Sequence, residues 1–251
     1  MGLKFSIITV SLNSRSTIKE TILSVLGQCY SNIEYIVVDG DSFDGTQDIV
    51  KSFAHGVDHF ISEKDSGIYN AMNKGLTLAT GDIVFFLNSD DIFIDEDVVS
   101  DISKVFTQSP ELEVVYGDQI FKIADQFVVK KQNFKITRKQ LAAMTIQHQT
   151  IFARKELFQR TKNFSEKYPI VSDYDWILNA FLKQRVRYQY INRAITVMGT
   201  EGMSWKYDFE DERRWVMKNY FTLSEIYLYR VLPQLVVNFT KKVKKIVLGA
   251  A

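Results

Sequence analysis

Short, nearly continuous apolar runs alternate with segments of helical periodicity along the first third of this chain. The strongest runs cover residues 4–10, 33–38 and 83–87. Continuous runs of this kind are typical of parallel strands that are buried on both faces. Between the first two runs, apolar side chains recur at helical spacing from Ile18 to Leu26. The alternation therefore predicts a doubly wound α/β fold, in which helices flank a mostly parallel sheet.

The remaining elements follow from the same periodicity and from turn signals. Gly27 marks the end of the first helix, and Thr17 and Glu20 have the spacing of a capping box at its start. Further strands are predicted at residues 59–62, twice within 112–129 around Gly117-Asp118, at 150–153 and at 186–197. Further helices are predicted at residues 47–53, 68–79, 95–106 and 173–182, and from Phe209 onward with a break at Pro233.

Composition excludes several classes of protein. The 31 basic and 30 acidic residues leave a net charge of +1, so global charge offers no argument for a nucleic-acid partner and none is predicted. The single cysteine, Cys29, allows no disulfide within the chain and fits a reducing compartment. Residues 5–10 are too short for the apolar region of a signal peptide, and no run of about 18 apolar residues predicts a membrane-spanning helix. A cytoplasmic location is therefore expected.

Polar loops follow three of the predicted strands, at residues 9–13, 39–44 and 88–91. Because ligands of open α/β sheets bind outside the carboxyl ends of the strands, these loops predict the position of a site. Residues 39–46 hold three carboxylates and two glycines, and glycine lets the backbone approach a ligand closely. We expect Asp39 to contact a ligand, whereas Asp44 suits a cap on the next helix.

Asn88-Ser89-Asp90-Asp91 directly follows the apolar run 83–87. Carboxylate and amide oxygens are the ligands that hard cations such as Mg²⁺ and Mn²⁺ prefer. A cation at this loop would bridge the phosphates of a ligand and stabilise a departing diphosphate. The alternative is a turn with an Asx cap on the following helix, because Asn and Asp are common turn residues. Spacing alone does not separate the two interpretations.

Taken together, these segments resemble the family 2 glycosyltransferases of the GT-A fold. The ordered set is more specific than any one of its motifs, and it extends over roughly residues 4–200. The closest likeness is to bacterial enzymes that build capsular, exopolysaccharide or lipopolysaccharide O-antigen chains. The matching stretches are Phe5-Ser6-Ile7-Ile8-Thr9-Val10, Val37-Val38-Asp39-Gly40, Asp44-Gly45-Thr46, Ala71-Met72-Asn73-Lys74-Gly75, Ala79-Thr80-Gly81-Asp82, Leu87-Asn88-Ser89-Asp90-Asp91, His148-Gln149 and Ser172-Asp173-Tyr174-Asp175-Trp176.

The resemblance implies roles for residues on the donor side. Asp39 looks like the family's uracil-binding aspartate, and Asn88-Ser89-Asp90 looks like its D-x-D motif, with Asp90 as the principal metal contact. Asn88 replaces the first acid of that motif, which is a departure from the pattern. The implied donor-binding residues are Thr9, Ser11, Asn13, Asp39, Asp41, Asp65, Asn73, Ser89 and Asp90, and the implied metal ligands are Asp90, Asp91 and Asn88.

The resemblance also implies the catalytic and acceptor-side residues. Asp173 matches the second position of the family's Glu-Asp motif, the usual general base, while Ser172 replaces the acid before it and Asp175 is the alternative base. Without the resemblance, Asp173 would be interpreted as a helix N-cap. His148 is a candidate to stabilise the leaving diphosphate or to contact the acceptor, although a lone histidine is as often structural. Acceptor contacts are implied for His148, Asp175 and Trp176.

The implied activity is transfer of a sugar, with inversion, from a nucleoside-diphosphate donor to a hydroxyl group. UDP is the expected nucleotide by analogy, and the expected acceptor is a glycan or a lipid-linked molecule in surface polysaccharide synthesis. The acceptor hydroxyl would attack the anomeric carbon opposite the leaving diphosphate and give its proton to a base within hydrogen-bond reach. Mn²⁺ or Mg²⁺ is the expected cofactor, because it would stabilise the charge on the leaving diphosphate.

We predict three segments: a nucleotide-sugar-binding half at residues 1–118, an acceptor-binding half of the same domain at 119–200, and a C-terminal helical extension at 201–251. The extension is rich in aromatic residues and continues into a basic cluster. It suits a helix on an anionic membrane surface, on the inner face of the cell membrane, or a helix packed on the catalytic domain with a solvated basic end. A homodimer contact is a third use for its apolar face. The basic cluster is Lys241, Lys242, Lys244 and Lys245.

Two rival functions remain open on the sequence. A sugar nucleotidyltransferase would share the layered fold, but such enzymes usually carry a glycine-rich loop after the first strand, and Ser11-Leu12-Asn13-Ser14-Arg15 has no glycine. A catalytically inactive GT-A-fold binding protein would explain Asn88 and Ser172. Retention of Asp39, Asp90, Asp91 and Asp173 together argues against that second rival.

Overall fold

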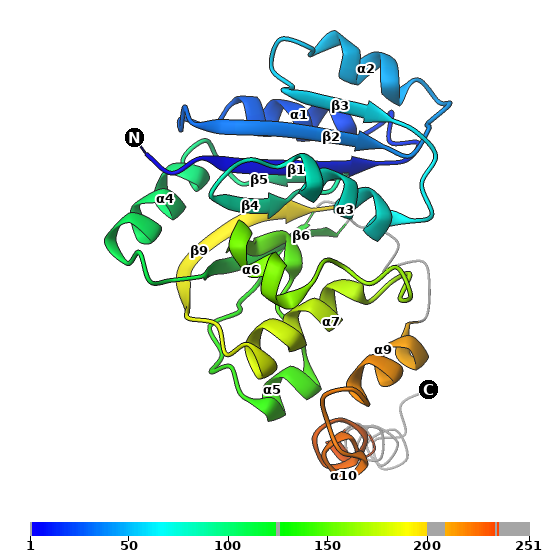
Figure 1. Cartoon of the computed structure of the whole chain (residues 1–251), viewed down its shortest axis with the longest axis vertical. Helices are drawn as coiled ribbons and strands as arrows, with labels where there is room; N and C mark the ends of the chain where they lie inside the picture. The colour runs from blue at the N-terminus through cyan, green and yellow to red at the C-terminus, as the bar shows by residue number, and fades with distance from the viewer. Residues whose placement is uncertain (1, 124–125, 200–208, 234, 236–251) are drawn as a thin grey trace.

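The protein is a three-layer α/β molecule in which a curled, nine-stranded sheet lies between two groups of helices (Figure 1). The computed structural model describes residues 2–123, 126–199, 209–233 and 235. The predicted α/β class is therefore confirmed. The position between residues 118 and 119 falls inside one strand, so the two predicted halves share a single sheet.

The first four strands of the central sheet in sequence run parallel, and the strands added later make the sheet mixed. The order across the sheet is β3-β2-β1-β4-β8-β6-β9-β5, with β7 paired to β6. The strands are β1 (Phe5–Ser11), β2 (Ile33–Asp39), β3 (His59–Ser62), β4 (Ile83–Phe86), β5 (Asp91–Phe93), β6 (Val114–Ile123), β7 (Gln126–Lys130), β8 (Ile151–Arg154) and β9 (Tyr188–Met198).

Both faces of the central sheet are buried, as the continuous apolar runs predict. Along β1, Phe5 and Ile7 pack into one hydrophobic cluster and Ile8 and Val10 into another, because successive side chains point to opposite faces. The first cluster contains residues of α1 (Ile18–Leu26), α2 (Thr46–Ser52) and α4 (Val98–Gln108). The second contains residues of α3 (Ile68–Leu78), α5 (Arg138–Ala143), α6 (Lys155–Thr161) and α7 (Ser172–Leu178), which a π turn at Asn179–Lys183 continues.

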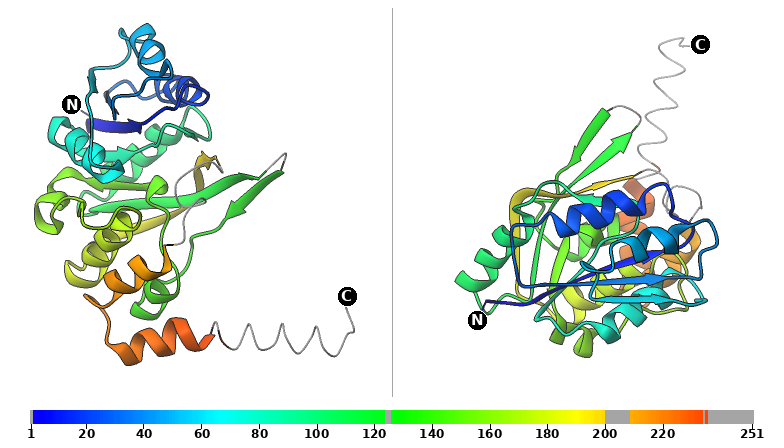
Figure 2. Two further views of the ribbon diagram at one scale, coloured as in Figure 1. Left: turned by 90° about the vertical axis from the view of Figure 1, so that its right-hand side faces the viewer. Right: turned by 90° about the horizontal axis from the view of Figure 1, so that it is seen from above.

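Gly117 lies inside β6, so the predicted turn around Gly117-Asp118 is wrong. A β-bulge interrupts the pairing with β9 at this point, and a Cβ atom on Gly117 would lie 2.4 Å from the carbonyl oxygen of Arg193. Glycine is therefore needed for close backbone approach and not for a reversal of the chain. In Figure 2, β6 and β7 project from the body of the molecule as an arm.

Two helix starts also differ from the prediction. Thr17 is the N-cap of α1, but its side chain makes no capping hydrogen bond, so the predicted capping box is absent there. The helix predicted from residue 95 begins at Val98, because the Asp95 carboxylate accepts a hydrogen bond from the Asp97 amide in a turn.

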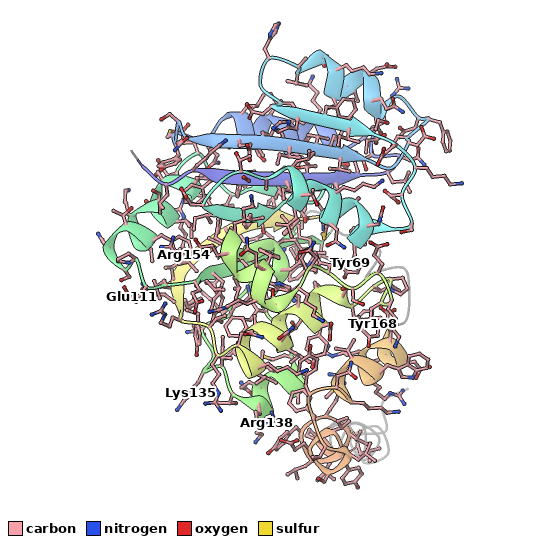
Figure 3. The ribbon with its side chains drawn as sticks, viewed as in Figure 1. Tyr69, Glu111, Lys135, Arg138, Arg154 and Tyr168 are labelled. Carbon is pink, nitrogen blue, oxygen red and sulfur yellow. The ribbon has the colours of Figure 1, made fainter. Side chains whose placement is uncertain are left out.

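The described part of the C-terminal extension packs on α5 and α7 (Figure 1). It comprises α9 (Glu210–Met217), α10 (Leu223–Ile226) and a π turn at Tyr227–Val231, and the helix continues through Pro233, where a break was predicted. Arg138, at the lower end of the molecule in Figure 3, pairs with Glu225 at 2.9 Å and donates to the Tyr220 carbonyl. The predicted lysine cluster at 241–245 lies outside the described residues. No helix of the described ranges is long and apolar enough to cross a membrane.

Glu34 ties the start of the central strands together. Its carboxylate, which is 3% exposed, accepts hydrogen bonds from Lys4 Nζ, Ser6 Oγ, and the backbone and hydroxyl of Thr80 at 2.5–2.8 Å. Burial raises the pKa of Glu34, but these hydrogen bonds outweigh it and hold the pKa at about 2. Because the folded-state pKa is depressed, the ionised group stabilises the fold above about pH 4.5, and that stabilisation is lost as the pH falls toward 2.

Glu34→Gln is therefore expected to lower the free energy of unfolding by about 2–3 kcal/mol at neutral pH. Urea denaturation at several pH values would measure this difference, which should be constant from pH 8 to 5 and shrink below pH 4.5. The exposed Glu20→Gln is the matched control and should change little. A Glu34→Gln penalty that did not vary with pH would show that the charge of Glu34 is not its source.

Candidate functional site

The carboxyl ends of β1, β2 and β3 meet in a hydrogen-bonded cluster around Asp39. The Asp39 side chain is fully buried, and its Oδ1 accepts hydrogen bonds from Ser11 Oγ at 3.0 Å and Ser42 Oγ at 2.6 Å. Its Oδ2 accepts from the Ser42 amide at 2.9 Å and from Ser62 Oγ at 2.8 Å. Three serine hydroxyl groups therefore satisfy the carboxylate and fix the three strand ends to one another.

The loop after β2 is braced against the loop after β1. Asn13 has φ 50°. Its side-chain oxygen accepts a hydrogen bond from the Phe43 amide, and its backbone amide donates one to Ser42 Oγ. Asp44 Oδ1 accepts hydrogen bonds from the amide and hydroxyl of Thr46, as a residue at the start of α2 should. Asp41 is exposed, also at positive φ, and Thr9 is buried, where its Oγ1 accepts a hydrogen bond from Tyr35.

Two further predicted donor residues lie around the start of α3. Asp65 sits against Gly40, where a Cβ atom would lie 2.6 Å from Asp65 Oδ2, so glycine makes room for this carboxylate. The Asn73 side chain donates to and accepts from the backbone of Phe164 at 2.8 and 3.0 Å. That pair of bonds fixes Asn73 in a structural contact within the described chain.

The Asn88–Asp91 loop is a turn with some side chains at a cavity and others in the protein interior. Ser89 Oγ lies 2.7 Å from Ser14 Oγ, which links this loop to the loop after β1. Asn88 and Asp90 line a cavity of about 770 Å³, whereas Asp91 is fully buried and is not among the lining residues. Burial and the neighbouring Asp90 charge raise the pKa of Asp91 well above its ordinary value.

The same cavity contains the predicted base and the predicted histidine. Asp173, near the start of α7, accepts a hydrogen bond from His148 Nδ1 on Oδ2 and one from the Tyr69 hydroxyl on Oδ1, both at 2.9 Å. All three residues line the cavity together with Asn88 and Asp90. Figure 3 labels Tyr69 on α3, facing the half of the molecule that holds α7. The structure therefore brings the two motifs, separated by more than eighty residues, to one space.

Electrostatics make Asp173 and His148 a polarised pair. Burial raises the pKa of Asp173, but the hydrogen bonds from His148 and Tyr69 and the imidazole charge outweigh it and lower the pKa below its ordinary value. His148 Nε2, the ring nitrogen opposite Asp173, is buried and has no hydrogen-bond partner in the structure. With Nδ1–H held by the carboxylate, Nε2 carries a lone pair that can accept a proton from a bound group.

Oxygen atoms at the Asn88–Asp91 loop fit a hard divalent cation. Asn88 Oδ1 is buried without a hydrogen bond to satisfy it, and Asp90 adds a carboxylate that lines the cavity. Such a set is the oxygen-donor chemistry that Mg²⁺ and Mn²⁺ use. Among the described residues, however, no three His, Cys, Asp or Glu side chains converge closely enough to form a complete site. A cation would therefore need further oxygen ligands, such as phosphates.

The two other residues predicted on the acceptor side lie away from the cavity. Trp176 is buried and stacks on Phe158 with ring centroids 4.9 Å apart. Asp175 is half-buried, and burial raises its pKa. Helical geometry explains the position of Asp175, because a residue two positions after Asp173 points to another face of α7.

Sequence reasoning missed several residues of the cavity. Tyr69 holds Asp173, and Lys130, Arg213 and Arg230 bring three cationic groups to the cavity wall. Tyr69 lies in the helix predicted after Asp65, but the spacing of residues along that helix does not indicate a partner 104 residues away. The cations come from β7, α9 and the π turn, so only the tertiary fold joins them.

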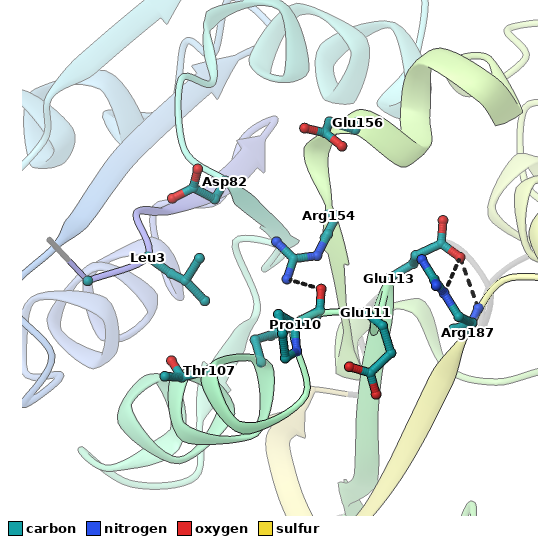
Figure 4. Close-up of a pocket in the computed structure, with 11 residues that line it drawn as sticks. Leu3, Asp82, Thr107, Pro110, Glu111, Glu113, Arg154, Glu156 and Arg187 are labelled. Carbon is teal, nitrogen blue, oxygen red and sulfur yellow. Dashed lines mark hydrogen bonds and ion pairs between the residues drawn. The ribbon is translucent and has the colours of Figure 1, made fainter.

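A second hollow, of about 740 Å³, lies at the opposite, amino-terminal end of the strands (Figure 4). Several of its charged groups, among them Arg154, Glu113 and Arg187, are engaged with each other or with the backbone. Arg154 donates to the carbonyls of Leu112 and Pro110, and Glu113 accepts from the Arg187 amide and pairs with Arg160. These contacts fix the ends of β6, β8 and β9 and indicate a structural role for this hollow.

Comparisons with known proteins give the class of enzyme to which the chain is similar. Residues 6–171 match the family model for glycosyl transferase family 2. A PGL/p-HBAD biosynthesis glycosyltransferase of Mycobacterium bovis (strain BCG / Pasteur 1173P2) is 29% identical over 199 residues, which cover 76% of this chain and 75% of the relative. These matches favour a glycosyltransferase over a sugar nucleotidyltransferase or an inactive binding protein.

Solved structures of low identity share the fold. The S. aureus TarS 1-349 structure in complex with UDP-GlcNAc has a TM-score of 0.72 at 21% identity, covering 90% of this chain and 67% of that one. Mannosyltransferase PcManGT from Pyrobaculum calidifontis, in complex with GDP-Man and Mn²⁺, has a TM-score of 0.62 at 19% identity, covering 85% of this chain and 61% of that one. The predicted GT-A fold is confirmed.

Proposed function

Because this chain belongs to glycosyl transferase family 2, we propose that it transfers a sugar from a UDP-sugar, with inversion, to a hydroxyl group of a surface-polysaccharide acceptor. The acceptor is a glycan or a lipid-linked glycan. The observation that carries the proposal is that the Asn88–Asp90 loop and the Asp173–His148 pair line one and the same cavity. A leaving diphosphate and an attacking hydroxyl need opposite sides of one such space.

The nucleoside half of the donor would occupy the strand ends above the cavity. Asp39 and its serine partners supply acceptors and donors for a base, and Asp65 beside Gly40 supplies a carboxylate for the ribose or the base. The imide N–H of a bound uracil ring would replace one of the serine hydroxyl groups as a hydrogen-bond donor to Asp39. In support, the TarS neighbour of the same fold is described in complex with UDP-GlcNAc.

A divalent cation would be held by Asp90 and Asn88 together with the donor phosphates. Bound there, it would neutralise charge that develops on the leaving diphosphate. The neighbouring Asp91 is buried and does not line the cavity, so it is not assigned to the cation. The PcManGT structure, which contains Mn²⁺, is a precedent from the same fold.

Proton transfer would be the task of the Asp173–His148 pair. The attacking hydroxyl gives its proton to His148 Nε2, while Asp173 holds the ring through Nδ1 and stabilises the imidazolium that forms. The Tyr69 hydroxyl contacts the other carboxylate oxygen at 2.9 Å and shares its proton with the Ile170 carbonyl at 2.7 Å. Asp173 thus acts in the proton transfer as the charged half of a unit, and the direct alternative is proton uptake by its own carboxylate.

A thermal-shift screen of nucleoside diphosphates, with and without Mn²⁺, would test the proposal. We expect UDP to raise the melting temperature more than other diphosphates, and only when Mn²⁺ is present, because a ligand that binds the folded state stabilises it. The shift should disappear in Asp90→Ala and persist in Glu111→Gln, which alters a carboxylate in the hollow at the opposite end of the strands. No shift with any nucleotide would contradict the proposed donor.

A further inference from the structure

Two cationic side chains in the cavity lack an anionic partner. Arg213 projects from α9, and its Nε and Nη2 atoms are buried without a hydrogen-bond partner in the structure. Lys130, at the end of β7, also lines the cavity. Neither has a carboxylate of the described ranges to itself: the Glu210 charge also acts on Arg213, but the carboxylate of Glu210 is paired with the nearby Arg230 at 2.5 Å.

Aromatic rings hold both unpaired cations in place. The Arg213 guanidinium lies 4.5 Å from the centroid of the Tyr174 ring, and Lys130 Nζ lies 5.7 Å from that of Phe121. Cation–π contact positions a charge but leaves its N–H donors available. Both side chains are therefore positioned to donate hydrogen bonds to a bound acceptor group.

The two charges also act on each other. Burial lowers the pKa of Lys130, and the Arg213 charge lowers it further. Burial likewise lowers the pKa of Arg213. Holding two like charges in a partly desolvated space costs free energy unless an anion enters between them. Ordinary packing does not explain the arrangement, because an apolar residue would fill either position without that cost.

We propose that Lys130 and Arg213 form a binding site for a phosphate group carried by the acceptor. A phosphate has the charge to pair with both cations, and the planar guanidinium suits its oxygens. The class of acceptor is thus a glycan or lipid-linked molecule that bears a phosphate near the hydroxyl to be glycosylated. This inference rests on the proposed function, because it takes the cavity to be the site of transfer.

Position in the fold assigns this phosphate to the acceptor and not to the donor. Tyr174, under the guanidinium, directly follows Asp173 in α7. Most residues that line the cavity follow position 120, although Ile68, Tyr69, Asn88 and Asp90 also line it. The donor-side residues Ser11, Asp39 and Ser62 are not part of the cavity wall. The apolar groups of that wall include Phe121, Met144, Val171, Phe209, Tyr229 and Pro233.

Octyl phosphate is a suitable probe, because it combines a phosphate with a short apolar chain. Calorimetric titration of the full chain, with UDP and Mn²⁺ already bound, should detect its binding, and the affinity should fall as salt rises. Arg213→Gln and Lys130→Gln should each weaken binding about tenfold, and Arg213→Lys should weaken it less. Arg214→Gln is the matched control, because Arg214 is exposed on the same helix and pairs with Asp211 at 3.2 Å.

Further ligands distinguish an acceptor phosphate from the donor diphosphate and from other head groups. Octanoate should bind more weakly than octyl phosphate, and neutral octyl glucoside should show no dependence on Arg213. Competition between octyl phosphate and UDP, or an equal loss of UDP affinity in Arg213→Gln, would overturn the proposal by assigning the cations to the donor diphosphate. Binding of octyl phosphate that neither substitution weakens would also overturn it. Failure of UDP itself to bind would instead contradict the proposed function.

Melting temperatures distinguish a ligand role from a structural one. Arg213→Gln should leave the melting temperature unchanged or raise it, because the substitution removes an unpaired, partly buried charge. A drop of several degrees in Arg213→Gln that Arg213→Lys restores, without any change in octyl phosphate affinity, would assign Arg213 to packing on Tyr174 and overturn the proposal.

Discussion

Asp173→Asn is expected to lower turnover by about 10²- to 10⁴-fold, the usual contribution of a general base, while UDP affinity stays within about twofold. The substitution keeps the size of the side chain and removes its charge. It therefore takes away the group that orients His148 and stabilises the imidazolium, but leaves the loop at Asn88–Asp91 intact. The Tyr69 hydroxyl can still donate to the amide oxygen, so the fold should be preserved.

Asp175→Asn is the matched control for this prediction. Asp175 lies two residues further along α7, it is outside the cavity, and it is the alternative base that the sequence allows. Initial rates of donor consumption with a saturating acceptor would separate the two variants. A large loss in Asp175→Asn with a near-normal rate in Asp173→Asn would reverse the assignment.

His148→Ala decides how the pair works. If Nε2 receives the proton, His148→Ala should lose about as much activity as Asp173→Asn, and the double variant should be little worse than either, because residues that act as a unit are not additive. A His148→Ala enzyme with near-normal turnover would assign the proton to the Asp173 carboxylate alone.

The sequence predicts the first half of the fold well because local signals and burial agree there. The runs at 4–10, 33–38 and 83–87 are apolar on both faces, and strands lie at each of them. The prediction fails at Gly117, because a glycine inside a strand can signal either a turn or a close approach, and only the position of Arg193 decides between them. It is less accurate at Val98, where a local turn delays the helix.

The candidate site divides in the same way. Motifs at strand ends, such as Asp39 and Asp90, can be located from sequence because the edge of a parallel sheet collects them. The partners of those motifs cannot. The Tyr69–Asp173 bond and the meeting of Lys130 with Arg213 depend on how α3, α7, β7 and α9 pack, and no periodicity along the chain encodes those distances.

Within the Asn88–Asp91 loop, sequence alone cannot tell which carboxylate faces the ligand. Asp90 and Asp91 are adjacent and chemically alike, so both match a metal-binding role. The turn sends Asp90 to the cavity and Asp91 into the protein beneath it, where Asp91 is the first residue of β5. A pair of isosteric substitutions can therefore separate the two positions.

Asp90→Asn is expected to reduce transfer by about 10²- to 10³-fold and to weaken Mn²⁺-dependent binding of UDP, because it removes the one carboxylate of this loop that lines the cavity. Asp91→Asn should keep most of the activity, since the side chain of Asp91 is buried and does not line the cavity. Titrating Mn²⁺ into each variant in the presence of UDP, with the transfer rate as the signal, would give both the apparent metal affinity and the limiting rate. If Asp91→Asn were the variant that lost metal dependence, the loop would have to turn Asp91 toward the donor on binding, and the assignment of Asp90 as the principal ligand would be wrong.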